Sequence, residues 1–247
     1  MHRFLVDPGS MKDDTVLLSK KESHHALSVL RIKTGEALEI FDGNGSGRRG
    51  IASKVVEGRL SVQMDKNDRG AKGALSSAAQ ITLAVSVIKP ERMDLLIQKS
   101  CELGVRRIVP LITERSVIKL SKERWEAKME RWKKIVLESC KQCGQTAPPE
   151  VDGPWKFDDF YPQSKNWGRV LIPTLALPGK NFYETCEGLN GEKTLVFIGP
   201  EGDFTKNEAQ KAVSCGALPV SLGPLVMRTE TAAIYVLSVL SFLSNRC

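Results

Sequence analysis

Histidine is scarce in this chain, and its distribution excludes several kinds of catalytic site. The three histidines, His2, His24 and His25, all lie near the amino terminus. A histidine-based zinc site or a Ser-His-Asp triad is therefore not expected in the rest of the chain. Among the six cysteines only Cys140 and Cys143 have metal-ligand spacing, and no second Cys-x-x-Cys pair accompanies them. The sequence predicts reduced thiols and no metal site.

Long apolar runs and the common nucleotide-binding fingerprints are missing as well. No stretch of eighteen apolar residues occurs, so neither a membrane span nor a membrane partner is expected. The amino terminus has no long apolar core and no small-residue cleavage site. We therefore expect a cytoplasmic protein, or an organellar one if a transit peptide has been removed. No Gly-x-Gly-x-x-Gly, Walker or Gly-x-Ser-x-Gly motif is present, which disfavours dinucleotide enzymes, P-loop enzymes and α/β-hydrolases.

Positive charge, in contrast, is in excess. The chain has 36 Lys and Arg against 29 Asp and Glu, a formal net charge of +7. Such a balance favours a polyanionic partner without identifying one. Residues 115–141 alone hold nine Lys or Arg against four Glu. This segment is either a solvated helix face or a surface that binds phosphates, and the sequence leaves both open.

The apolar pattern divides the chain into two domains, 1–72 and 73–247. The first has short strand-like runs between Gly, Asn and Asp turns and a helix expected to begin at Ser23, so it is predicted to be a small β-rich barrel or sandwich. Residues 65–79 are polar and contain glycine, typical of a linker. The second domain alternates apolar strands with longer helices, which predicts a mainly parallel sheet covered on both faces. Its expected strands are 81–88, 107–112, 169–175, 194–198 and 219–222, and its expected helices are 91–103, 121–142, 180–188, 205–215 and 229–243.

Two loops of the second domain have unusual compositions for their positions. Strand 194–198 runs into Gly199-Pro200-Glu201-Gly202-Asp203, where the glycines allow close approach of a ligand to the backbone. Thr205 and Glu208 then form the pattern of a capping box. Strand 219–222 runs into an apolar segment, 222–227, that Gly and Pro interrupt, so it is neither a plain helix nor a plain strand. In open α/β sheets ligands bind beyond the carboxyl ends of strands, and these loops are either that site or ordinary turns.

Two charged residues follow the apolar segment. Arg228 comes directly after it, at the junction with the last helix, and is expected either to pair with a carboxylate or to face an anionic substrate. Glu230 lies in the first turn of that helix, where the helix dipole favours a negative charge.

The chain resembles the RsmE family, SPOUT-class enzymes that methylate N3 of a uridine in small-subunit ribosomal RNA. The similarity extends over essentially the whole length and includes both loops. It is carried by Met1-His2-Arg3-Phe4, His24-His25, Val29-Leu30-Arg31, Phe41-Asp42-Gly43, Lys99, Glu102-Leu103-Gly104-Val105, Pro110, Thr113-Glu114-Arg115-Ser116, Glu138 and Gln142.

The resemblance implies a PUA-like RNA-binding domain followed by a SPOUT domain with a C-terminal trefoil knot. It implies a homodimer, S-adenosylmethionine as methyl donor, no metal, and 16S-type small-subunit ribosomal RNA within the assembled subunit as partner. The donor contacts that it implies are Leu175, Gly199, Glu201, Gly202, Leu222, Gly223, Leu225, Met227, Thr231 and Ala232. The RNA contacts that it implies, together with the basic segment, are Arg3, His25, Arg31, Arg115 and Gln142. Arg228 is expected to stabilise charge on the uridine. Glu230 or Glu201 could accept the N3 proton, and Glu230 is the candidate that we favour.

Two positions depart from the family pattern. The loop usually reads Gly-Pro-Glu-Gly-Gly, and Asp203 stands at its fifth place. If the second glycine is needed for a positive φ, Asp is among the few tolerable replacements. Gln145 stands where the family usually has an arginine, so one RNA contact is not expected here. Two alternatives remain open: a SPOUT methyltransferase acting on another RNA, and a non-catalytic RNA-binding factor in ribosome assembly.

Overall fold

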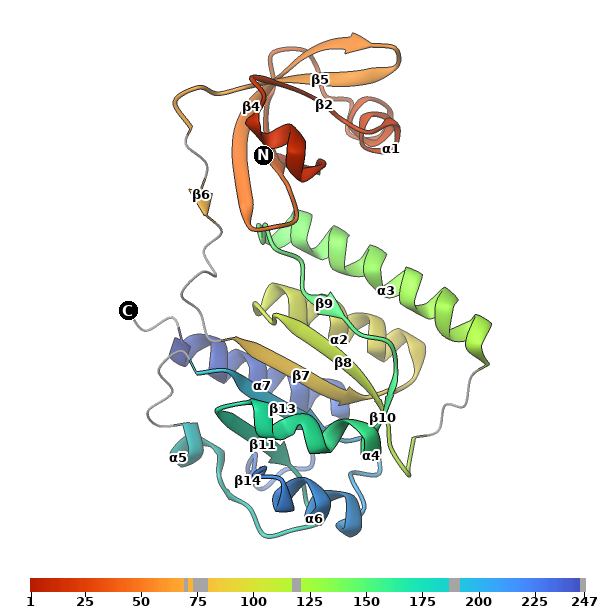
Figure 1. Cartoon of the computed structure of the whole chain (residues 1–247), viewed down its shortest axis with the longest axis vertical. Coiled ribbons are helices and arrows are strands. Elements are labelled where there is room, and N and C mark those ends of the chain that lie inside the picture. Colours follow the sequence, from red (N-terminus) through yellow and green to blue (C-terminus); the bar gives the residue numbers. More distant parts are fainter. Residues whose placement is uncertain (69–70, 73–79, 117–120, 187–191, 245–247) are drawn as a thin grey trace. The chain divides into compact units, whose positions relative to one another are not determined.

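The computed structural model describes residues 1–68, 71–72, 80–116, 121–186 and 192–244, and its chain forms two compact units (Figure 1). Unit 1 consists of Met1–Ser76 and Leu137–Pro148, and unit 2 of Ser77–Val136 and Pro149–Cys247. Residues 69–70 and 73–79 of the expected linker lie outside the described residues. The sequence did not predict that a segment from the middle of the chain would join the first unit. That segment includes the end of helix α3 (Lys122–Cys143), which thereby contributes to both units.

Unit 1 is built on one sheet, as its turn-rich strand pattern predicted. The strands are ordered β1 (His2–Leu5), β3 (Ala37–Phe41), β4 (Ser46–Val56), β5 (Arg59–Met64) and β2 (Thr15–Leu17), and β6 (Ala71–Lys72) pairs with β4. All pairings but the parallel β1–β3 pair are antiparallel. Phe4, Leu38, Ile40 and Val62 are fully buried in its core. A short 3₁₀ helix, η1 (Pro8–Lys12), joins β1 to β2.

The helical segment of unit 1 begins earlier than the sequence predicted. Helix α1 spans Lys20–His24 and continues into η2 (His25–Val29), so the expected start at Ser23 was wrong. Ser19 is the N-cap, because its Oγ accepts the Glu22 N–H at 3.1 Å. The Ser23 hydroxyl is used instead to fix the helix to the sheet: it donates to the Leu18 carbonyl and accepts the Leu60 N–H at 2.9 Å.

Unit 2 is a parallel sheet. Its strands are ordered β10 (Trp155–Lys156), β8 (Arg107–Ile112), β7 (Ile81–Ser86), β13 (Thr194–Ile198), β11 (Arg169–Pro173), β14 (Leu218–Ser221) and β12 (Lys180–Asn181), and β9 (Glu150–Val151) pairs with β8. Every pairing is parallel. The central strands β7 and β13 are buried along their whole length, which explains their continuous apolar sequences.

Helices cover both faces of this sheet (Figure 1). An aromatic cluster lies under the helices on one side, which are α4 (Phe157–Phe160), η3 (Tyr161–Asn166) and α6 (Lys206–Ser214). In this cluster the centroid of the Phe157 ring lies 5.8 Å from that of Phe197 and 5.4 Å from that of Phe204. Elsewhere α2 (Pro90–Glu102) packs against α7 (Thr229–Ser244), which also contacts β13. Helix α5 (Phe182–Cys186) follows β12. The five helices expected from the sequence are thus confirmed, with ends within a few residues, except that residues 187 and 188 of the expected helix 180–188 lie outside the described residues. Of the helices in the described residues, none is long and apolar enough to cross a membrane.

Candidate functional site

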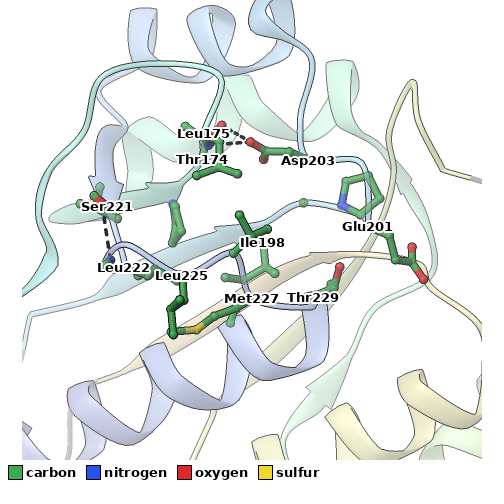
Figure 2. A pocket seen from close by; sticks show the side chains of 17 residues that line it. Thr174, Leu175, Ile198, Glu201, Asp203, Ser221, Leu222, Leu225, Met227 and Thr229 are labelled. Carbon is green, nitrogen blue, oxygen red and sulfur yellow. Dashed lines mark hydrogen bonds between the residues drawn. The ribbon is translucent and has the colours of Figure 1, made fainter.

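The three loops that leave β11, β13 and β14 meet at one edge of the unit 2 sheet. These strands are adjacent and parallel, so their carboxyl ends lie together. The loops line a pocket that is open to solvent (Figure 2). The pocket is lined by Pro173, Thr174, Leu175, Ile198, Gly199, Pro200, Glu201, Asp203, Val220, Ser221, Leu222, Gly223, Leu225, Val226, Met227, Thr229 and Ala232.

Eight of the ten residues expected to contact the donor line this one pocket. They are Leu175, Gly199, Glu201, Leu222, Gly223, Leu225, Met227 and Ala232. The other two, Gly202 and Thr231, are sequence neighbours of lining residues but do not line the pocket themselves. The Gly202 carbonyl instead accepts a hydrogen bond from the Arg115 guanidinium, which brings a residue expected to contact RNA beside the loop after β13.

The loop after β13 is tightly folded, and one glycine is essential to it. A Cβ on Gly199 would lie 3.0 Å from the Phe204 nitrogen and 3.2 Å from Asp203 Oδ1, closer than the packing allows without movement. The loop ends in the expected capping box: Thr205 Oγ1 accepts the Glu208 N–H, and Glu208 Oε2 accepts the Thr205 N–H at 2.9 Å. Glu208 Oε1 also accepts the Glu114 N–H, so the same buried carboxylate holds the loop after β8.

Asp203 joins the loop after β13 to the loop after β11. Its φ is 59°, so the backbone is in the left-handed region, as expected if this position requires a positive φ. Carboxylate Oδ2 accepts the Leu175 N–H at 2.6 Å and the Thr174 hydroxyl at 2.9 Å (Figure 2). Oδ1 accepts the Phe204 N–H at 2.7 Å. A glycine here could adopt the same backbone but could not make this bridge.

The loop after β14 supplies the apolar wall. Leu225 and Val226 are 78% and 79% exposed, unusually open for large apolar side chains. Gly223, at φ +119°, turns the chain in a conformation that other residues rarely adopt. At the end of the loop, the Thr229 hydroxyl is buried without a hydrogen-bond partner among the described residues. The loop therefore gives the pocket an apolar surface, and a buried hydroxyl without a partner among the described residues lies at its end.

A cation that sequence reasoning missed links two of the candidate carboxylates. Arg92, in the first turn of α2, lies 3.5 Å from Glu201 Oε1 through Nη1 and 3.7 Å from Glu230 Oε1 through Nε. Glu230 is 8% exposed and does not line the pocket, whereas Glu201 does. No local sequence signal could have revealed this contact, because Arg92 is far from both carboxylates in sequence.

Arg228 occupies the N-cap position of α7, and its side chain is exposed. Its carbonyl accepts the Ala232 N–H at 2.8 Å, the first hydrogen bond of the helix. Within the described part of the chain its guanidinium forms no salt bridge, so the expected alternative of a carboxylate partner is not seen there. A cation at a helix amino terminus is disfavoured by the helix dipole, so helix stability does not explain it.

The residues expected to contact RNA differ in the solvent exposure of their side chains. Arg31, Arg115 and Gln142 are exposed, and Arg31 has a positive φ of 56° immediately beyond η2. His25 is half-buried against the Phe4 ring. The Arg3 side chain is only 8% exposed, because it pairs with Glu39 and donates to the Cys140 carbonyl. Gln145, which replaces the usual arginine, is buried.

The basic segment 115–141 is partly neutralised. Lys141, 10% exposed at its side chain, donates to Glu22 Oε1 at 2.8 Å inside unit 1. Burial lowers the pKa of Lys128, whose ammonium lies 5.6 Å from the centre of the Trp132 ring. The other ion pairs of the segment within the described residues are Arg131 with Asp94, Lys133 with Glu130 and Lys141 with Glu138. Phosphate binding by the remaining cations stays a prediction.

Comparison with known families gives two matches. The RNA methyltransferase domain family matches residues 75–241, and the RNA methyltransferase PUA domain family matches residues 18–50. Among curated proteins, ribosomal RNA small subunit methyltransferase E of Buchnera aphidicola (Schizaphis graminum strain) is 32% identical over 92% of this chain and 90% of its own. The Aquifex aeolicus protein of the same name is 36% identical over 78% of this chain and 76% of its own.

Two solved structures are similar over nearly the whole chain. One is described as a methyltransferase of Legionella pneumophila in complex with the bound cofactor SAM, with a TM-score of 0.85 and 34% identity over 98% of both chains. The other is ribosomal RNA small subunit methyltransferase E of Neisseria gonorrhoeae bound to S-adenosyl methionine, with a TM-score of 0.83 and 27% identity over 98% of both chains.

Proposed function

This chain belongs to the RNA methyltransferase family, and on that premise we propose that it transfers the methyl group of S-adenosylmethionine to N3 of a uridine in small-subunit ribosomal RNA. One observation carries the proposal. Loops from three separate parts of the sequence converge on a single pocket at the carboxyl edge of the unit 2 sheet, and most of the residues that the family resemblance named line it.

The chemistry of the pocket lining supports S-adenosylmethionine as its ligand. The apolar segment with Leu225 and Met227 can pack against an adenine ring, and the unpartnered Thr229 hydroxyl can bind a polar group of the ligand. The absence of a side chain at Gly199 lets the loop after β13 fold closely against Phe204 and Asp203. When bound, this donor supplies an electrophilic methyl group on a positively charged sulfur. The protein has to hold the acceptor nitrogen in line with it, and positioning of this kind can contribute roughly 7–11 kcal/mol.

Arg228 is the residue best placed to act on the base. Methylation at N3 requires loss of the imide proton, which leaves negative charge on the uracil oxygens. A guanidinium is always protonated, so Arg228 stabilises that charge and cannot remove the proton. Its exposure and its lack of a salt bridge in the described residues leave it available for this role.

The proton acceptor is one of the two carboxylates that Arg92 contacts. Glu230, the expected acceptor, is buried and lies in the first turn of α7, two residues after Arg228. Glu201 lines the pocket and is more exposed. We propose Glu230 as the acceptor, with Glu201 as the second candidate, and Arg92 as the cation that pairs with both carboxylates.

Unit 1, which contains the segment matched by the PUA domain family, is proposed to hold the RNA backbone. Arg31 and Gln142 are exposed in unit 1 and are available for phosphate contacts. Arg115 lies in unit 2, beside the loop after β13. Arg3 and His25 are proposed to shape this surface rather than reach out from it. The substrate is proposed to be the assembled small subunit, which places the protein in the cytoplasm or in an organelle that contains ribosomes.

We further propose a homodimer and a knotted C-terminal segment, both implied by the family resemblance. Apolar side chains are exposed around the pocket and on the neighbouring helices, which supports a partner subunit that covers them. They are Leu95 of α2, Leu225 and Val226 of the pocket, and Tyr235 and Phe242 of α7. The knot is supported by the strand order, in which β11 lies between the later strands β13 and β14, and by the return of α7 to pack on β13 and α2.

A methyl-transfer assay tests the proposal. Small ribosomal subunits from cells that lack this protein are incubated with it and with donor that carries a labelled methyl group. We expect label in the small-subunit RNA and none in large-subunit RNA treated in parallel. A protein that only binds RNA would transfer no label to either, and this result would refute catalysis.

A further inference from the structure

Asp203 differs from the other pocket carboxylate in having no cationic partner among the described residues. The Glu201 carboxylate lies 3.5 Å from the Arg92 guanidinium, which offsets its charge. The three hydrogen bonds of Asp203 all come from uncharged donors, the backbone N–H groups of Leu175 and Phe204 and the hydroxyl of Thr174. Asp203 therefore brings an uncompensated negative charge into the lining of the pocket.

This charge is fixed in position. The side chain is half-buried and accepts hydrogen bonds at both oxygens, from the loop after β11 and from its own loop. Its backbone conformation, at φ 59°, sets the direction in which the side chain leaves the chain. A charge held this way needs no reorganisation when a ligand arrives, and it interacts more strongly with an opposite charge than a mobile surface carboxylate does.

We propose that Asp203 is a specificity-determining residue of the pocket, which favours the positively charged methyl donor over the uncharged product. The inference rests on the proposed function. During transfer the N3 proton passes to the proposed acceptor Glu230, the bond between sulfur and the methyl carbon breaks with its electron pair left on sulfur, and the methyl carbon bonds to N3. The sulfonium thereby becomes a neutral thioether, S-adenosylhomocysteine. A fixed carboxylate in the pocket stabilises only the first of these two sulfur centres, so it strengthens donor binding relative to product binding.

Calorimetric titration of the full chain with S-adenosylmethionine and with S-adenosylhomocysteine tests this inference. Asp203→Asn keeps the side-chain shape and tolerates the positive φ, and Asp203→Gly keeps the backbone conformation. In both variants we expect the affinity ratio of donor to product to fall about tenfold, the size of a partly screened interaction between unit charges. Thermal unfolding of each variant verifies that it is folded.

Thr174→Val is the matched control, because it removes the hydrogen bonds that the Thr174 hydroxyl makes with Asp203 and with the Ala176 N–H and leaves the charge of Asp203 in place. If the role of Asp203 were purely structural, all three variants would lose affinity for the donor and for the product by the same factor. We expect such an equal loss only in Thr174→Val. An unchanged ratio in Asp203→Asn and Asp203→Gly, with the wild type still binding the donor, overturns this inference alone. A wild type that binds neither ligand overturns the proposed function and this inference with it.

Discussion

Replacing Arg228 with Ala should lower kcat for methyl transfer by about 10²–10³-fold and leave donor affinity within about twofold, as for loss of one preorganised group that stabilises developing charge. The guanidinium is exposed at the start of α7, has no salt bridge in the described residues, and is not among the side chains that line the donor pocket. Its contribution is therefore expected in the transition state rather than in donor binding. Single-turnover rates with small subunits, alongside calorimetric donor affinities, measure the two effects separately.

Two further variants test whether the loss of kcat is specific to the Arg228 guanidinium. Arg228→Lys keeps the charge but loses the planar fork, so a partial recovery of kcat is expected. Lys206→Ala removes another exposed cation at the start of a helix, that of α6, outside the pocket, and should leave kcat unchanged. Equal losses of turnover and donor affinity in Arg228→Ala would contradict its role at the uridine.

Replacing Gly223 with Val should weaken donor binding by roughly 10- to 100-fold, which corresponds to about 1–3 kcal/mol of backbone strain. A side chain at this position would meet no neighbouring atom, so the effect arises from the backbone alone: φ is +119°, which a β-branched residue does not adopt. The exposed loop can relieve the strain by moving, but the wall of the pocket moves with it. Calorimetric titration with the donor measures the loss.

Gly216→Val is the matched control for this variant. Gly216 also has a positive φ, +95°, and open space around its Cβ position, but it lies beyond the end of α6 and does not line the pocket. We expect it to lower the midpoint of thermal unfolding without changing donor affinity. If Gly223→Val bound the donor like the wild type, the loop after β14 would not form the donor site.

The sequence predicted the architecture of unit 2 well because its elements have strong, regular patterns. Buried parallel strands such as β13 are continuous apolar runs, and long amphipathic helices such as α3 repeat their apolar residues at helical spacing. The segment with α4 and η3 was missed, because such short helices show too few turns for periodicity to appear. The membership of Leu137–Pro148 in unit 1 depends on contacts distant in sequence, such as Lys141 with Glu22.

The sequence predicted the backbone features of the loops at the candidate site but not the interactions of its charged side chains. The glycines, the capping box and the positive φ of Asp203 follow from local backbone chemistry, which the sequence displays directly. The bridge from Asp203 to Thr174 and the contact of Arg92 with Glu201 and Glu230 join separate segments. Pairings of this kind depend on how the strands are ordered in the sheet, which no spacing along one sequence specifies.

Nucleoside analysis of the treated RNA tests the central claim most directly. Small-subunit RNA from cells that lack the protein is digested to nucleosides before and after treatment with the protein and S-adenosylmethionine, and the products are separated and identified by mass. The account predicts that N3-methyluridine is absent before treatment and appears after it with the wild type, at one site per RNA molecule. Methylation of a ribose hydroxyl or of another base, or no new methylated nucleoside at all, would contradict it.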